Sequence, residues 1–268
     1  MGHQRLGSIP TSRRWADVVE EVAGAGTAQS GGAATAAHAI PDIADRTLQA
    51  AEAGLERAIN DPGLRFTFYL LTQIVLAARE QDWRDRLRQL GIQLTEASSV
   101  FEFTAEVQRV IDDHLLTHGG STDTSEMAQQ AAGEAIAELT GPNSVTLFGA
   151  GEEELKAAVR ALSTKAGFSN LGQRFFGSFM TRFLNFYLSR VTAGQVGGRL
   201  GGSTGLTEFN DALRTHCLQS AKIVHDFCGE WYSKTEFKRG IDLDNTSGFM
   251  AVALRKLQAE LRRQREGS

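Results

Sequence analysis

The sequence contains few cysteines, few prolines and no apolar run long enough to cross a membrane. Only two cysteines, Cys217 and Cys228, occur in 268 residues. A secreted disulfide scaffold uses more, so we expect a reducing, cytoplasmic compartment. The most apolar run, residues 66–78, is shorter than the roughly 20 residues that span a bilayer. No apolar stretch of the kind found in signal peptides follows the first residues, and we expect no contact with a membrane.

The sequence also lacks a strong excess of charge of either sign. Its 28 lysines and arginines and 32 aspartates and glutamates give a formal net charge of −4 at pH 7. Nucleic acids and anionic membranes attract strongly basic proteins, so this balance argues against either as the principal partner. Binding of nucleic acid stays open as a third hypothesis, because the predicted last helix carries a basic cluster. Its members are Arg255, Lys256, Arg262, Arg263 and Arg265.

Apolar residues recur at helical spacing along most of the chain. The only segment that resembles a strand is residues 145–148, which is too short to form a sheet. We therefore predict an all-α fold, a multi-helix domain with orthogonal and bundle-like packing over residues 40–268. Its helices are expected over residues 40–60, 64–79, 83–90, 100–118, 124–140, 152–163, 170–192, 207–233 and 245–265.

The predicted helix over residues 170–192 is rich in aromatic residues. Its apolar side chains cover an arc of roughly 180°, whereas a surface helix needs only about 100°. We expect it to be the interior helix around which the others pack, and a groove for a flat apolar ligand is the alternative. The side chains concerned are Phe175, Phe176, Phe179, Met180, Phe183, Leu184, Phe186 and Tyr187.

A short helix is separated from this domain by a predicted flexible linker. We assign residues 1–23 to an N-terminal arm, with a helix over residues 13–22, and residues 24–39 to a Gly/Ala-rich linker. One face of the short helix is apolar, and it consists of Trp15, Val18, Val19 and Val22. Such a face on a tether either docks into the groove of a protein partner or folds back on its own domain.

Two stretches resemble known motifs but lack the context that the chemistry requires. Residues 242–246 have the D-x-D-x-T spacing of a phosphatase nucleophile loop, yet too few residues follow for the sheet of such an enzyme. As a calcium loop, the same stretch lacks the glycine and glutamate of its sixth and twelfth positions. Residues 197–204 have the glycine spacing of a P-loop without its lysine. We interpret the first as a turn that caps the last helix and the second as a connection between helices.

Candidate metal ligands are sparse, and we predict no metal ion or cofactor. His114 and His118 are one helical turn apart, a spacing that can hold one ion, so they are the candidates to test. His225 and Cys228 have the spacing of half a zinc site, but Cys217 lies too far along the same helix to complete it. The alternative function is a helical metal-dependent hydrolase or a ligand-binding protein with a site assembled from distant residues. Its first candidates would be Asp113, His114, His118 and His225.

Two segments carry a family resemblance. The first is residues 1–10, MGHQRLGSIP, followed by Arg13-Arg14-Trp15. The second consists of His216-Cys217, Ile223-Val224, Phe227 and Trp231-Tyr232-Ser233-Lys234. Together they resemble helical proteins of bacterial anti-phage defence operons, of the QatB type, which accompany a deazaguanine-synthase-like enzyme. The resemblance implies a non-enzymatic partner protein whose N-terminus is engaged by that enzyme, with Gly2 as the residue engaged or modified.

These observations together favour a binding role over an enzymatic one. We expect a protein-interaction or scaffold subunit of a bacterial multi-protein system, because the chain combines a tethered arm with mild charge and no motif that fits its context. The residues expected to bind the partner are Gly2, Trp15, Val18, Val19 and Val22.

Overall fold

The computed structural model describes residues 10–25, 32–95, 98–144, 152–195 and 203–266. Within these ranges the elements are helices and no β-strand occurs, which confirms the all-α prediction. None of the helices described is long and apolar enough to cross a bilayer. They are α1 (Arg13–Ala25), α2 (Gly32–Ala50), α3 (Glu52–Ile59), α4 (Pro62–Ala77), α5 (Trp83–Gln89), α6 (Val100–Thr117), α7 (Asp123–Ser144), α8 (Glu152–Ala161), α9 (Lys165–Gln195), α10 (Ser203–Ser220), α11 (Lys222–Arg239) and α12 (Leu243–Glu266).

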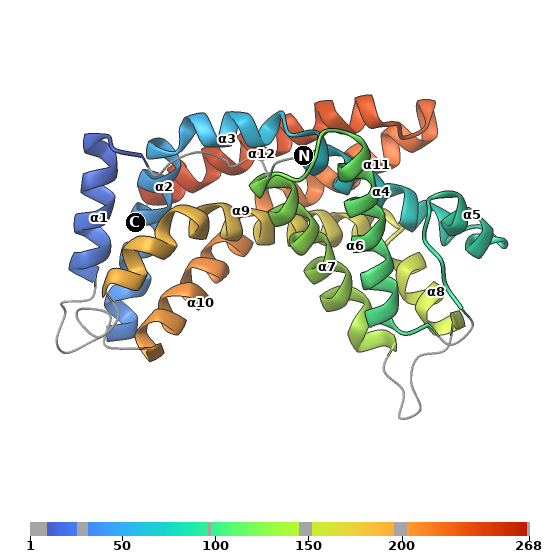
Figure 1. Cartoon of the computed structure of the whole chain (residues 1–268), viewed down its shortest axis with the longest axis horizontal. Coiled ribbons are helices and arrows are strands. Elements are labelled where there is room, and N and C mark those ends of the chain that lie inside the picture. The colour runs from blue at the N-terminus through green and yellow to red at the C-terminus, as the bar shows by residue number, and fades with distance from the viewer. Residues whose placement is uncertain (1–9, 26–31, 96–97, 145–151, 196–202, 267–268) are drawn as a thin grey trace.

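The long helix α9 runs through the middle of the molecule (Figure 1). It packs most extensively against α7, α10 and α11. In the view of Figure 1, α3 and α12 lie above α9, whereas α7 and α10 extend below it in different directions. α1 and α2 close the left-hand end, and α5 and α8 form the right-hand end.

The aromatic face of α9 is buried, as the sequence predicts. Phe175, Phe176, Phe179 and Phe183 are all 0% exposed. Phe68 of α4 packs against this row, with its ring centroid 5.2 Å from those of both Phe175 and Phe176. A buried aromatic side chain contributes roughly 1.5–3 kcal/mol of transfer free energy. The row is therefore a principal source of stability, and α9 is the interior helix of the domain.

Two glycines allow the first half of α9 to lie very close to α11. A Cβ added to Gly172 would overlap the thiol of Cys228, and one added to Gly229 would overlap the backbone oxygen of Lys165. Only the hydrogen side chain of glycine fits at either position, so glycine permits this close approach of the two helices. This contact fixes the N-terminal end of α9 against α11.

The arm folds back on the domain. Trp15 is 6% exposed, Val18 and Val22 are 0% exposed, and Val19 is half-buried. α1 packs against α2 and α9, and the ring of Trp15 meets that of Tyr187 edge to face at a centroid distance of 6.3 Å. Of the two alternatives for this apolar face, the structure shows the contact with its own domain.

Several helix boundaries differ from those predicted, and the predicted helix over residues 40–60 is two helices, α2 and α3, which are separated at Ala51. The predicted helix over residues 207–233 is two helices, α10 and α11, with a break at Ala221. α2 begins at Gly32, so residues 32–39 of the predicted linker are helical, and Pro41 lies inside this helix rather than in its first turn. Alanine has the highest helix propensity, and it dominates residues 33–39. The strand-like residues 145–148 and residues 197–202 of the P-loop-like stretch lie outside the described residues.

Candidate functional site

The two histidines proposed as metal ligands form part of an aromatic stack. The rings of His114 and His118 are stacked at 4.0 Å with an interplanar angle of 16°, and the other face of His114 stacks on Phe66 at 3.5 Å. A metal ion lies in the plane of each imidazole ligand, about 2.0–2.1 Å from its nitrogen. Two nearly parallel rings this far apart cannot both bind one ion. Burial, and then the neighbouring His118, lower the pKa of His114.

The other candidates for a distant-residue site are engaged separately. Asp113 accepts a hydrogen bond from Arg109 at 2.6 Å on α6. His225, on α11, has Asp226 at 2.7 Å from its Nδ1 and Asn170 at 3.2 Å from its Nε2. Within the described part of the chain, no group of three or more His, Cys, Asp or Glu side chains is placed to hold a metal ion. The residues that the hydrolase alternative requires are therefore not assembled into a site.

Residues 242–246 form the turn that the sequence analysis favoured. The carboxylate of Asp242 accepts the backbone N–H of Asn245 at 2.7 Å, and the Asn245 side chain accepts the N–H of Asp242 at 3.3 Å. These reciprocal bonds have the pattern of a capping box at the start of α12. Asp242 rather than Asn245 or Thr246 is therefore the capping residue, and its carboxylate is used in the cap.

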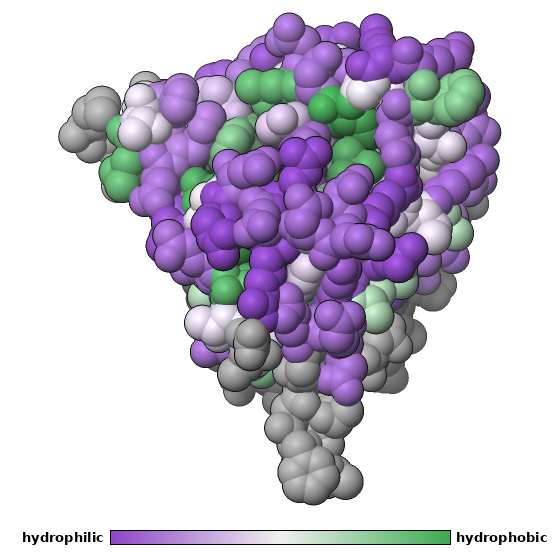
Figure 2. Space-filling model, turned by 90° about the vertical axis from the view of Figure 1, so that its right-hand side faces the viewer, coloured by the Kyte–Doolittle hydropathy of each residue, from purple (hydrophilic) through white to green (hydrophobic). Residues whose placement is uncertain are grey.

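A surface that the sequence did not indicate lies at the end of the molecule formed by α5, α8 and the ends of α4, α9 and α11. We call it the end face. Figure 2 looks onto it and shows a mostly hydrophilic surface with hydrophobic residues gathered in its upper part. Two cavities open here, and Arg79, which follows α4, lines both of them.

Arg79 is held firmly between these cavities. Its guanidinium donates hydrogen bonds to the carboxylate of Glu236 and to the backbone oxygen of Ser163. It also lies over the ring of Tyr232, with its central carbon 5.4 Å from the ring centroid. These contacts come from α11 and from the turn between α8 and α9, so the cation is fixed in position even though its side chain is about one third exposed.

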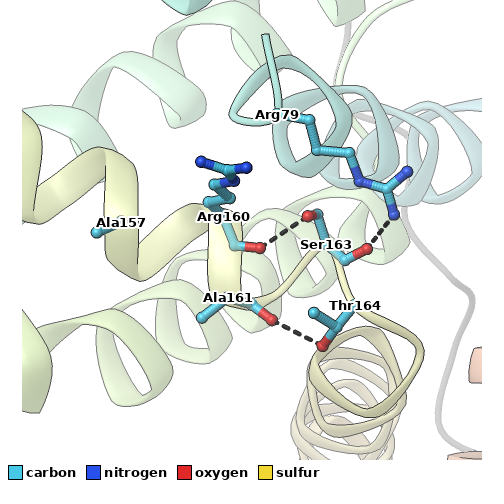
Figure 3. Close-up of a pocket in the computed structure, with 6 residues that line it drawn as sticks. All are labelled: Arg79, Ala157, Arg160, Ala161, Ser163 and Thr164. Atoms are coloured by element: carbon cyan, nitrogen blue, oxygen red, sulfur yellow. Dashed lines mark hydrogen bonds between the residues drawn. The ribbon is translucent and has the colours of Figure 1, made fainter. Parts of the chain in front are cut away.

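The first cavity, which we call the α8–α9 cavity, has a volume of about 540 Å³. Its lining contains two arginines, two hydroxyl residues and two alanines, and no acidic side chain. These residues are Arg79, Ala157, Arg160, Ala161, Ser163 and Thr164. Figure 3 shows that the hydroxyl groups of Ser163 and Thr164 donate to the backbone oxygens of Arg160 and Ala161, which holds the turn between α8 and α9.

The second cavity, which we call the α5–α11 cavity, has a volume of about 390 Å³ and a mixed lining. Its lining residues are Gln73, Leu76, Ala77, Arg79, Glu80, Arg86, Gln89, Leu90 and Glu236. Next to it, the Gln73 side chain donates a hydrogen bond to the backbone oxygen of Ile241 at 3.1 Å and so ties α4 to the turn between α11 and α12.

The last turn of α11 carries an exposed aromatic residue beside this cavity. Phe237 follows the lining residue Glu236 and is 91% exposed. Leu243, after the turn, is 41% exposed. The next two residues after Phe237, Lys238 and Arg239, are exposed and have no hydrogen-bond or ion-pair partner among the described residues. A large apolar side chain is thus presented to solvent one residue after Glu236, which lines the cavity, while Phe237 itself does not line it.

Comparisons with known proteins provide no relatives. No protein-family model, curated protein or solved structure matches the chain significantly.

Of the residues that form the end face, only Phe237 had a signal in the sequence. The buried stripe of α11 includes Val224, Cys228 and Tyr232. At 100° per residue, Phe237 lies opposite Cys228 on the helix. An aromatic residue on the polar side of an amphipathic helix is the pattern that could have pointed to this surface. Arg79 and Arg160 carry no comparable signal, because arginines are common on exposed helix positions.

Proposed function

We propose that this protein is a protein-interaction subunit that binds a partner through the end face. The observation that carries the proposal is the 91% exposure of Phe237 beside the α5–α11 cavity. Aromatic side chains are enriched among the residues that contribute most to protein–protein binding, and they act where a pocket and surrounding contacts exclude water. A protein segment with an apolar residue that fills the cavity would cover Phe237 and Leu243 together.

The fixed position of Arg79 supports the same proposal. A residue held by Glu236, Ser163 and Tyr232 loses little conformational freedom when a partner binds. The floor of the surface is therefore rigid, while Lys238 and Arg239 at its rim remain able to pair with acidic groups. A polar rim around an apolar centre is the usual composition of a protein interface.

The family resemblance suggests the context of this binding. It supports a role in a bacterial multi-protein system of anti-phage defence, with a deazaguanine-synthase-like enzyme as partner and Gly2 as the residue engaged. Gly2 lies outside the described residues, and Trp15, Val18 and Val22 are buried against their own domain. A partner that uses the arm would have to displace α1, whereas the end face is accessible without rearrangement.

The test is affinity capture from the cells in which the gene occurs, with full-length protein and two matched variants. Phe237→Ser removes the proposed anchor, and Phe101→Ser removes a phenylalanine that is 85% exposed at the start of α6 and lines neither cavity. Both substitutions are on the surface, so circular dichroism should show folded proteins. We expect a co-purifying protein with the wild type and Phe101→Ser that is absent with Phe237→Ser. Identical sets of captured proteins for all three would refute the proposal.

A further inference from the structure

The α8–α9 cavity differs from the rest of the end face in its charge. Its lining includes the side chains of Arg79 and Arg160 and no carboxylate. Ala157 and Ala161 are one turn apart on α8, and their small side chains leave the space into which Arg160 can reach. The cavity is therefore open and bears the positive charge of Arg160, whereas the charge of Arg79 is paired with Glu236.

The two arginines have complementary properties. The guanidinium of Arg160 makes no hydrogen bond or ion pair with any described residue, and Figure 3 shows it without contacts to the other lining residues. That of Arg79 is anchored, and its two hydrogen bonds to Glu236 and Ser163 use two of the five N–H donors of a guanidinium. One cation is thus fixed and the other is exposed and unpaired; the two guanidinium groups lie apart in Figure 3, so Arg160 would have to turn toward Arg79 to share a ligand with it.

From this arrangement we infer that the α8–α9 cavity binds the phosphate group of a small phosphate monoester. Arginine presents a planar fork of donors that matches phosphate oxygens. A phosphate monoester carries close to two negative charges at neutral pH, so it gains more from two arginines than a singly charged carboxylate does. The start of α9 borders the cavity and adds partial positive charge, but the arginine pair carries the assignment.

This inference does not depend on the proposed function. The α8–α9 cavity and Phe237 belong to different helices, and a small phosphate ester can bind whether or not a protein covers the α5–α11 cavity. A captured partner that is lost with Phe237→Ser says nothing about phosphate, and phosphate binding says nothing about that partner. The two results can therefore fail separately.

The experiment titrates the full-length protein with phenyl phosphate, inorganic phosphate and acetate, followed by isothermal calorimetry and by 31P line width for the phosphates. We expect saturable one-to-one binding of phenyl phosphate. Arg160→Ala should weaken it about tenfold or more, since a charge-assisted contact is lost. Arg239→Ala is the matched control, because it removes another exposed and unpaired arginine that lines neither cavity, and it should bind as the wild type does.

A second variant tests the cavity without removing an arginine. Ala157→Glu places a carboxylate three residues before Arg160, where it can pair with that side chain within one helix. The position is exposed on α8, so the fold should be retained while phosphate binding is lost. Absence of saturable phosphate binding to the wild type, equal affinity in Arg160→Ala, or stronger binding of acetate than of phenyl phosphate would each overturn the inference.

Discussion

Replacing Glu134 with glutamine should make the protein less stable at neutral pH and less sensitive to acid. Glu134 lies on α7, where its carboxylate accepts bonds from Arg214 at 2.6 Å, Arg182 at 2.6 Å and the hydroxyl of Ser178. Arg182 and Ser178 belong to α9, and Arg214 belongs to α10. One carboxylate thus links three helices, and Glu138 extends the network by pairing with Arg214 as well.

The size of the effect follows from the pKa of this carboxylate. Burial raises the pKa of Glu134, but the hydrogen bonds from Ser178, Arg214 and Arg182 together lower it from 4.5 to about 2. One pKa unit corresponds to about 1.4 kcal/mol, so the depression corresponds to about 3 kcal/mol of stability at pH 7. The Glu134 side chain is 22% exposed, and solvent screening makes this an upper value.

The sign of the pH dependence is fixed by the direction of the shift. A carboxylate whose pKa is lower in the folded protein contributes its full stabilisation above the unfolded value of 4.5 and loses it as the pH falls toward 2. At pH 3.5, about 1.4 kcal/mol of the contribution should already be lost. The difference in unfolding free energy between wild type and Glu134→Gln should therefore shrink over this range.

Urea denaturation at pH 7, 4.5 and 3.5, monitored by circular dichroism, measures this difference. Glu153→Gln, at an exposed position in the first turn of α8, is the control; it removes only a favourable interaction with the helix dipole and should lower the unfolding free energy by about 0.3–1 kcal/mol. A loss in Glu134→Gln that stays constant from pH 7 to pH 3.5 would show that the carboxylate charge is not responsible. Stability equal to that of the wild type at pH 7 would show that the network contributes nothing.

Two further predictions concern the arm and the thiols. Trp15→Ala removes a buried aromatic contact with Tyr187, a change that typically costs about 3–5 kcal/mol. Because α1 packs only at the edge of the domain, amide hydrogen exchange should become faster in residues 13–25 but not in α9. Equal protection of α1 in both proteins would contradict the observed contact. Cys217 and Cys228 are buried and free, and burial raises the thiol pKa of both. A chromogenic thiol reagent should therefore label neither cysteine in the native protein and both after unfolding. Rapid labelling of the native protein would show that the helices around them open.

The helices could be predicted because their signals are local. The aromatic arc of α9 exceeds what one exposed face needs, and this alone places the helix in the interior. The break between α10 and α11 has no such signal, because residues 218–222 contain neither glycine nor proline and Ala221 keeps a helical φ of −67°. α10 and α11 both pack on α9 and α12, and α10 also packs on α2, so the change of direction depends on tertiary contacts that sequence periodicity does not report.

The arm shows a different limit of sequence reasoning. The spacing of Trp15, Val18 and Val22 predicts that this face of α1 is buried, and the structure confirms it. The spacing does not predict which surface covers this face, because a groove on a partner and a groove between α2 and α9 would both require the same apolar residues on α1. The choice depends on the shape of a distant surface.

The end face could not be predicted because Arg79 is defined by contacts that are remote in the chain. Ser163 lies 84 residues away and Glu236 lies 157 residues away, so no spacing motif relates them. In the folded protein Arg79 lines both cavities, and its guanidinium pairs with Glu236. An anion that binds beside Arg160 would interact with the same guanidinium. A phosphate bound in the α8–α9 cavity would therefore compete with Glu236 for Arg79.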